Sequence, residues 1–198
     1  MPEQPLDPQQ LETLRQAIAS GDPARAMPAL AGLREVAPEQ AIPLLLLGLQ
    51  QETFMIRSLS CAGLGYKQSE QGWQALVMAL QQDDDPNVRA EAANALVSYS
   101  LERSQPLLLE AFAANGHWLV RCSILSAVAE LIDVPSGWLL ELAGLAIADA
   151  DGTVRVGGAE ILGRLVAEGS AQARALLVPL QADSDHRVVA AALNGLQG

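Results

Sequence analysis

Residues 85–96, Asp-Pro-Asn-Val-Arg-Ala-Glu-Ala-Ala-Asn-Ala-Leu, decide the fold, because close variants of this stretch recur along the chain. The copies share a closing apolar residue, which stands at Leu64, Leu96, Val128, Leu162 and Leu196, a period of about 32 to 34 residues. A fixed period of this length is typical of solenoids built from helical hairpins. The sequence therefore predicts an all-α fold, a right-handed α-solenoid of about six antiparallel helical hairpins.

The repeated stretch has the apolar pattern of a buried helix face. Val88, Ala92, Ala95 and Leu96 fall at positions i, i+4, i+7 and i+8, which form one stripe on a helix. Small residues occupy the matching places in other copies and are expected to let neighbouring helices approach closely: Gly63, Gly158, Ala192 and Gly195. Each inner helix is therefore expected to bury this stripe against its neighbours.

The spacing of the copies also predicts the domain organisation. Residues 1–8 are interpreted as a flexible N-terminal arm and 9–198 as a single solenoid domain, divided into a divergent hairpin at 9–37 and five regular repeats at 38–198. The leucine-rich outer helices of the repeats are expected at about 38–50, 70–82, 104–114, 136–148 and 170–181. The inner helices are expected at about 53–66, 86–99, 117–132, 153–167 and 186–197.

Composition and charge exclude several classes of function. The chain has 23 acidic and 12 basic residues, a net charge of −11 that repels phosphate backbones and anionic lipids. The apolar run 42–49 is too short to span a bilayer, and the polar start 1–8 lacks the features of a signal peptide. Cys61 and Cys122 stand far apart and outside any CxxC motif, which suits free thiols in a reducing compartment. We therefore expect a cytoplasmic protein with no nucleic-acid partner and no membrane insertion.

The pattern Asp-Pro-x-Val-Arg-x-Glu-Ala-Ala-x-Ala-Leu at 85–96 resembles a HEAT repeat of the subclass named after phycobilisome lyases, and the resemblance extends over about 38–198. Proteins with such repeats include paired lyases that attach bilins to phycobiliproteins, relatives involved in phycobilisome breakdown, and scaffolds without chemistry. Two departures stand out. His117-Trp118 replaces the usual acidic turn, and Val189 stands where the other copies have arginine.

Charged side chains recur at two equivalent positions, and each set has two interpretations. Arginines at Arg57, Arg89, Arg121 and Arg155 are predicted to stack into a structural ladder in which each guanidinium bonds to a turn or cap acid. The alternative is a basic stripe for an anionic ligand. Acids crowd the turns before the inner helices, at Asp83, Asp84, Asp85, Asp149, Asp151, Asp183 and Asp185. We interpret them as helix caps and solvated surface acids, with a metal site as the alternative.

Partner-binding residues are expected at the helix starts and on the concave face. Trp118 stands at the first turn of an inner helix, beside His117 and at the position that Phe54 takes in an earlier copy. An aromatic side chain there is either an exposed anchor for a partner or a staple against the preceding repeat. The polar residues expected to line the concave surface are Glu91, Asn94, Ser126, Glu130, Glu160 and Arg164.

The sequence contains no Ser/His/Asp constellation, no phosphate-binding loop and no metal-ligand cluster, so we predict no catalytic residue, no metal and no cofactor. The predicted function is a non-catalytic scaffold or adaptor that binds a protein along its concave face. The resemblance implies phycobiliprotein or phycobilisome handling, with a phycobiliprotein or a second HEAT-repeat subunit as partner. The alternative is a subunit of a phycobilin lyase that transiently binds a linear tetrapyrrole. Self-association through the C-terminal end, at Leu193 and Leu196, is a third possibility.

Overall fold

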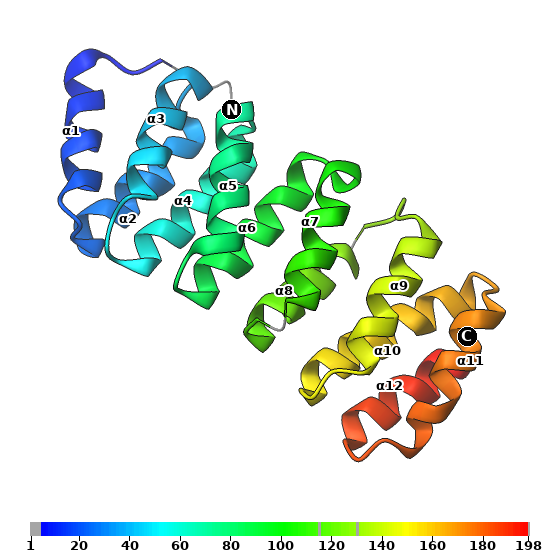
Figure 1. Ribbon diagram of the computed structural model, residues 1–198. Coiled ribbons are helices and arrows are strands. Elements are labelled where there is room, and N and C mark those ends of the chain that lie inside the picture. The colour runs from blue at the N-terminus through cyan, green and yellow to red at the C-terminus, as the bar shows by residue number, and fades with distance from the viewer. Residues whose placement is uncertain (1–4, 115, 130, 198) are drawn as a thin grey trace. The chain divides into compact units, whose positions relative to one another are not determined.

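The computed structural model describes residues 5–114, 116–129 and 131–197, and their regular structure is helical throughout, with no strand (Figure 1). The all-α prediction is therefore confirmed. The elements are α1 (Pro8–Ala19), α2 (Pro23–Gly32), the 3-10 turn η1 (Leu33–Glu35), α3 (Pro38–Gly48), α4 (Phe54–Lys67), α5 (Glu70–Gln82), α6 (Pro86–Tyr99), α7 (Leu101–Ala113), α8 (Trp118–Ala129), α9 (Ser136–Ile147), α10 (Gly152–Ala167), α11 (Ala171–Leu177), the 3-10 turn η2 (Val178–Ala182) and α12 (His186–Gln197).

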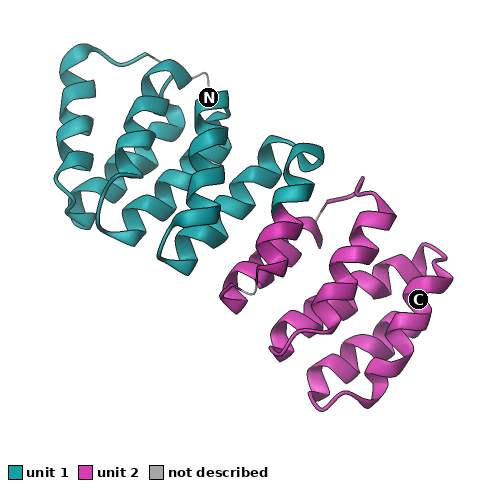
Figure 2. Cartoon of the chain, viewed as in Figure 1, with its two compact units in different colours: residues 1–107 teal, residues 108–198 magenta. Residues whose placement is uncertain are grey.

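The chain divides into two compact units, residues 1–107 and 108–198, with the boundary inside α7 (Figure 2). In unit 1, α1 packs with α2, α3 with α4, and α5 with α6, while the inner helices α2, α4 and α6 pack side by side in that order. In unit 2, α9 packs with α10, and α11 and η2 pack with α12. There α10 lies between α8 and α12. Both units thus repeat one arrangement, a helical hairpin whose second helix joins an inner layer.

Aspartates begin the inner helices as the sequence predicts. The side chain of Asp85 accepts a hydrogen bond from the Asn87 N–H at 2.8 Å, and Asp151 accepts one from the Thr153 N–H at 2.8 Å. Asp185 does the same with the Arg187 N–H at 2.9 Å. These bonds satisfy N–H groups that have no partner inside the first helical turn. The predicted capping role is confirmed for these three acids, whereas Asp83, Asp149 and Asp183 pair with arginines instead.

Helices α7 and α11 differ from their expected bounds for identifiable reasons. Helix α7 begins at Leu101 instead of about 104, because Ser100 Oγ accepts a hydrogen bond from the Arg103 N–H at 3.3 Å and caps an earlier start. The α-helical part of the fifth outer helix ends at Leu177, since Pro179 has no N–H for the next α-helical bond and the chain continues as a 3-10 turn. The second helix likewise ends in the 3-10 turn η1.

The predicted apolar stripe forms the core of the repeats. Val88, Ala92, Ala95 and Leu96 are all buried. Helices α4 and α6 approach so closely that a Cβ added to Gly65 would lie 2.8 Å from the Cβ of Ala95. Small side chains in the inner layer therefore set the spacing of the repeats.

The described part of the N-terminal arm is held against α3. The Leu6 N–H donates to Gln40 Oε1 at 2.8 Å, and Gln40 Nε2 donates to the Leu6 carbonyl at 3.0 Å. Asp7 then caps α1, which begins at Pro8. Residues 1–4 of the arm lie outside the described residues. Within the helices that the structure describes, none combines the length and apolar composition needed to cross a membrane.

Candidate binding groove on the inner helices

Three of the four ladder arginines hold the turn before the next inner helix. Arg57 forms two parallel bonds to Asp83, with Nε–Oδ2 at 2.7 Å and Nη2–Oδ1 at 2.9 Å. Its Nη1 donates to the carbonyls of Gln51 and Glu52 at 3.0 and 2.7 Å. The same bidentate pairing joins Arg121 to Asp149 and Arg155 to Asp183.

The aspartates of these pairs are charged acceptors with several donors. Hydrogen bonds from Arg155 and from the Asp185 N–H hold the pKa of Asp183 below its ordinary value. Burial alone would raise the pKa of Asp83, but bonds from Arg57 and the Asp85 N–H leave it lowered. Because protein acceptors occupy these guanidinium donors, the geometry favours a structural role for the ladder over a stripe for an anionic ligand.

Arg89 differs from the other three. Its Nη1 donates to the carbonyls of Asp83 and Asp84 at 2.6 and 3.3 Å, and no carboxylate within the described chain pairs with it. One period beyond Asp83 the sequence has Asn115 in place of an aspartate, and this position lies outside the described residues. The sequence therefore lacks the aspartate that would pair with Arg89 in the pattern of the other three arginines.

Among the residues that the structure describes, no group of three or more His, Cys, Asp or Glu side chains could hold a metal ion.

The aromatic residues at the helix starts are partly exposed. Trp118 is 43% exposed and Phe54 38% exposed. His117 is exposed, its ring centroid lies 5.7 Å from that of Trp118, and its Nδ1 accepts a hydrogen bond from the Leu119 N–H at 3.3 Å. This bond gives His117 a role at the start of α8. Phe54 belongs to unit 1, whereas His117 and Trp118 belong to unit 2.

The polar residues predicted to line the inner face of unit 1 meet in a hollow between α4 and α6. Its volume is about 450 Å³. The half-buried carboxyl of Glu91 has a raised pKa because burial disfavours its charged form. The residues that line this hollow are Ala62, Gly65, Tyr66, Gln68, Glu91, Asn94, Ala95 and Ser98.

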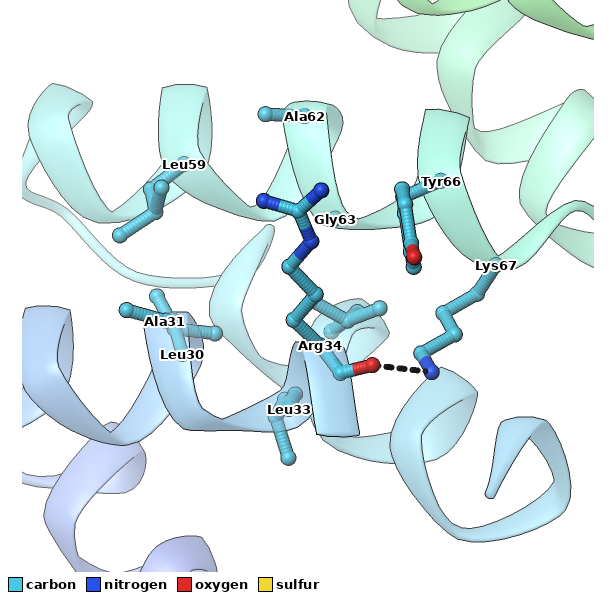
Figure 3. A pocket seen from close by; sticks show the side chains of 10 residues that line it. Leu30, Ala31, Leu33, Arg34, Leu59, Ala62, Gly63, Tyr66 and Lys67 are labelled. Carbon is cyan, nitrogen blue, oxygen red and sulfur yellow. Dashed lines mark hydrogen bonds between the residues drawn. The ribbon is translucent and has the colours of Figure 1, made fainter. Parts of the chain in front are cut away.

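A second hollow, of about 400 Å³, lies between α2 with η1 and α4 (Figure 3). Its floor is formed by the buried side chains of Leu30, Leu33 and Leu45, and further lining comes from Ala31, Leu59 and Gly63. The Arg34 side chain extends from η1 toward α4 between Leu59 and Tyr66. Its guanidinium carbon lies 4.8 Å from the centre of the Tyr66 ring.

The two hollows of unit 1 adjoin, because Ala62 and Tyr66 line both. We call the pair the inner groove. Lys67 also lines it, yet this side chain is 5% exposed and its Nζ donates to the carbonyls of Arg34 and Val36 at 2.9 and 2.6 Å. The groove is therefore apolar near Leu59, with an exposed cation at its mouth, and polar near Glu91.

Unit 2 has a smaller hollow of about 190 Å³ between α8 and α10, where Ser126, Glu160 and Cys122 lie together with five other residues. Arg164 is engaged elsewhere, since its Nη1 and Nη2 donate to the carbonyls of Leu131 and Ile132 at 2.6 and 2.8 Å. These bonds tie α10 to the chain after α8. Glu130, also predicted to line this face, lies outside the described residues.

Sequence reasoning missed Arg34, Leu30 and Leu33. They lie in the divergent first hairpin, where the repeat pattern is weak. The sequence did contain one indication of the position of Arg34, which stands 33 residues, or one repeat period, before Lys67. That spacing places Arg34 beside the C-terminal end of the next inner helix.

The chain has the architecture of a helical-repeat protein. In each unit, helical hairpins pack with their second helices in one layer, and hollows lie along that layer. Residues 42–129 match the family model of HEAT repeats. A comparison with curated proteins gave no significant match.

Solved structures similar to this chain come from several kinds of protein. The Escherichia coli protein YibA is 16% identical, with a TM-score of 0.70 over 96% of this chain and 70% of that chain. Human deoxyhypusine hydroxylase, solved in complex with glycerol, is 15% identical, with a TM-score of 0.52 over 96% of both chains. The complex of CpcE and CpcF of phycocyanin lyase from Nostoc sp. PCC7120 is 20% identical over 97% of this chain and 100% of that chain, but its TM-score is only 0.43. At these identities the first two likenesses show the fold alone, and the third carries no weight.

Proposed function

We propose that this protein is a non-catalytic scaffold or adaptor that binds another protein along its inner helices. The inner groove is the observation that carries the proposal. It joins two hollows of about 400 and 450 Å³ on one layer of helices, and its lining combines leucines, an exposed arginine and small polar residues. Helical-repeat proteins use extended surfaces of this kind for binding.

The chemistry of the two thiols favours binding over thiol catalysis. Cys61 is buried, and burial raises its pKa to about 12. Cys122 lines the hollow of unit 2, and burial raises its pKa as well. A nucleophilic cysteine needs a lowered pKa, so neither thiol is prepared for nucleophilic attack at neutral pH.

The sequence resemblance supports a phycobiliprotein or another HEAT-repeat subunit as the partner to test first. It also supplies the alternative function, a phycobilin-lyase subunit that binds a linear tetrapyrrole. The two functions differ in a visible property, because only the lyase subunit would hold a pigment.

The test is affinity capture from native lysate with the tagged protein, with captured proteins identified by mass spectrometry. Ser98→Arg places a bulky charge in the inner groove, and Gln74→Arg adds the same charge at an exposed position of α5 as a matched control. Trp118→Ala tests the exposed aromatic of unit 2 separately. We expect a defined set of proteins that is lost with Ser98→Arg and retained with Gln74→Arg.

Two results would change the conclusion. Capture that is the same with Ser98→Arg and with Trp118→Ala as with the wild type would contradict binding at these surfaces. A coloured eluate with the sharpened absorbance band of a bound tetrapyrrole would favour the lyase subunit instead.

A further inference from the structure

We infer that the inner groove holds a peptide segment of the partner in which an apolar side chain enters the hollow beside Leu59 and a neighbouring carboxylate pairs with Arg34. The inference rests on the proposed function and adds to it the chemistry of the bound segment and its direction along the groove.

The hollow between α2 and α4 has the features of a side-chain pocket. Its volume of about 400 Å³ lies within the range of ligand sites, and leucine side chains form its floor. Leu59 is half-buried at its edge, whereas Leu30, Leu33 and Leu45 are buried beneath it. An apolar side chain placed there removes apolar surface from water on both partners.

Arg34 supplies a free cation beside this pocket. Within the described part of unit 1, Arg25 and Arg34 are the basic side chains that form neither a hydrogen bond nor an ion pair. The other arginines bond to carboxylates or carbonyls: Arg15 to Glu12, Arg57 to Asp83, Arg89 to Asp83 and Asp84, and Arg103 to Glu70. Arg34 is the member of the free pair that lines the groove.

The Tyr66 ring orients Arg34 without using its hydrogen-bond donors. The cation lies 4.8 Å from the ring centre, a cation–π contact, so the planar donor fork stays available. A guanidinium in this state suits a carboxylate, which accepts two parallel N–H bonds. The chain as a whole carries a charge of −11, so Arg34 supplies a local attraction for an anion that the net charge of the protein repels.

The shape of the groove favours a peptide over a compact small molecule. The apolar hollow continues past Ala62 and Tyr66 into the polar hollow with Glu91, Asn94 and Ser98. A chain seated in both would place its acidic group at Arg34 and its hydrogen-bond donors or basic side chains at Glu91. A peptide bound in the opposite direction would place its acidic group at Glu91 and its basic side chains at Arg34, so like charges would meet at both ends.

The test is selection of displayed random dodecapeptides against the full-length protein, followed by fluorescence anisotropy of the enriched peptides. Arg34→Gln removes the cation but keeps the backbone carbonyl that accepts from Lys67. Arg25→Gln is the matched control, since Arg25 is an exposed and unpaired arginine of α2 that lies outside the groove. Ala62→Phe fills the junction of the two hollows, and circular dichroism verifies that each variant is folded.

We expect enriched peptides with an apolar residue next to aspartate or glutamate, bound at least about tenfold more weakly by Arg34→Gln and unchanged by Arg25→Gln. Ala62→Phe should abolish binding. The inference is overturned if the enriched peptides lack the acidic residue, if the two arginine variants bind alike, or if Ala62→Phe gives the same enrichment as the wild type.

A failure of the peptide inference can be distinguished from a failure of the proposed function. If lysate proteins are lost with Ser98→Arg but retained with Arg34→Gln, the scaffold function is supported and the carboxylate contact with Arg34 is contradicted. If every groove variant captures the same lysate proteins as the wild type, both the scaffold function and the peptide contact are contradicted.

Discussion

Gly163 of α10 and Gly195 of α12 bring their backbones into direct contact. A Cβ added to Gly163 would lie 2.8 Å from the Cα of Gly195, and one added to Gly195 would lie 2.6 Å from the Cα of Gly163. Backbone atoms cannot move aside as a flexible side chain does. The spacing of these two inner helices therefore depends on the absence of side chains at both positions.

Gly163→Ala should lower the free energy of unfolding by about 1–3 kcal/mol, the usual cost of forcing extra atoms into a packed core. Gly144→Ala is the control, because nothing lies within 4 Å of a Cβ at this position of α9. Alanine is the better helix former, so that variant should gain up to about 1 kcal/mol. Urea unfolding followed by circular dichroism measures both. Equal effects of the two substitutions would contradict the role given to the Gly163–Gly195 contact.

The repeat period predicted the helices well because one residue pattern, in phase with the helix turn, sets burial, caps and close contacts together. The predictions for the inner face were less complete. Glu91 and Asn94 line the hollow between α4 and α6, because they lie one position beside the buried stripe, which fixes their direction. Arg34 and Arg164 were not resolved by the same reasoning, since the lengths and bends of long side chains decide which carbonyl or ring they reach.

Arg121→Met should destabilise the protein more than removal of an exposed arginine. The side chains of Arg121 and Asp149 are 9% and 10% exposed, so the substitution leaves a mostly buried carboxylate without its bidentate partner. A loss of about 3–5 kcal/mol in the free energy of unfolding is typical of such a change. Arg187→Met, which removes a 52% exposed arginine paired with Asp185, should have a much smaller effect, because solvent screens an exposed ion pair. Chemical unfolding of both variants checks the difference, and similar losses would count against the structural role of the buried pair.

Stability should fall as the pH drops from about 5 toward 2. The pKa of Asp83 is lowered in the folded protein from 3.8, and that of Asp185 is lowered to about 2. The unfolded chain therefore binds more protons than the folded chain in this window, so acid favours unfolding. The difference in the free energy of unfolding between the wild type and Asp83→Asn should become smaller as the pH falls. Protonation of Asp83 weakens its ion pair with Arg57, the pair that the substitution removes. Unfolding curves measured across this pH range test the sign, and a constant difference would contradict it.

The two cysteines should react with alkylating reagents at different rates in the folded protein. Cys61 is buried and its pKa is raised to about 12, so almost no thiolate is present or accessible at neutral pH. Cys122 is partly exposed in the hollow of unit 2, and its pKa is raised as well, which predicts slow but measurable alkylation. Iodoacetamide labelling followed by peptide mass spectrometry should therefore modify Cys122 first, and Cys61 only when urea unfolds the chain. Cys122→Ser supplies the control, since it should leave the native protein almost unlabelled. Fast labelling of Cys61 in that variant would show that α4 opens in the native state and that the floor of the inner groove is less rigid than its packing indicates.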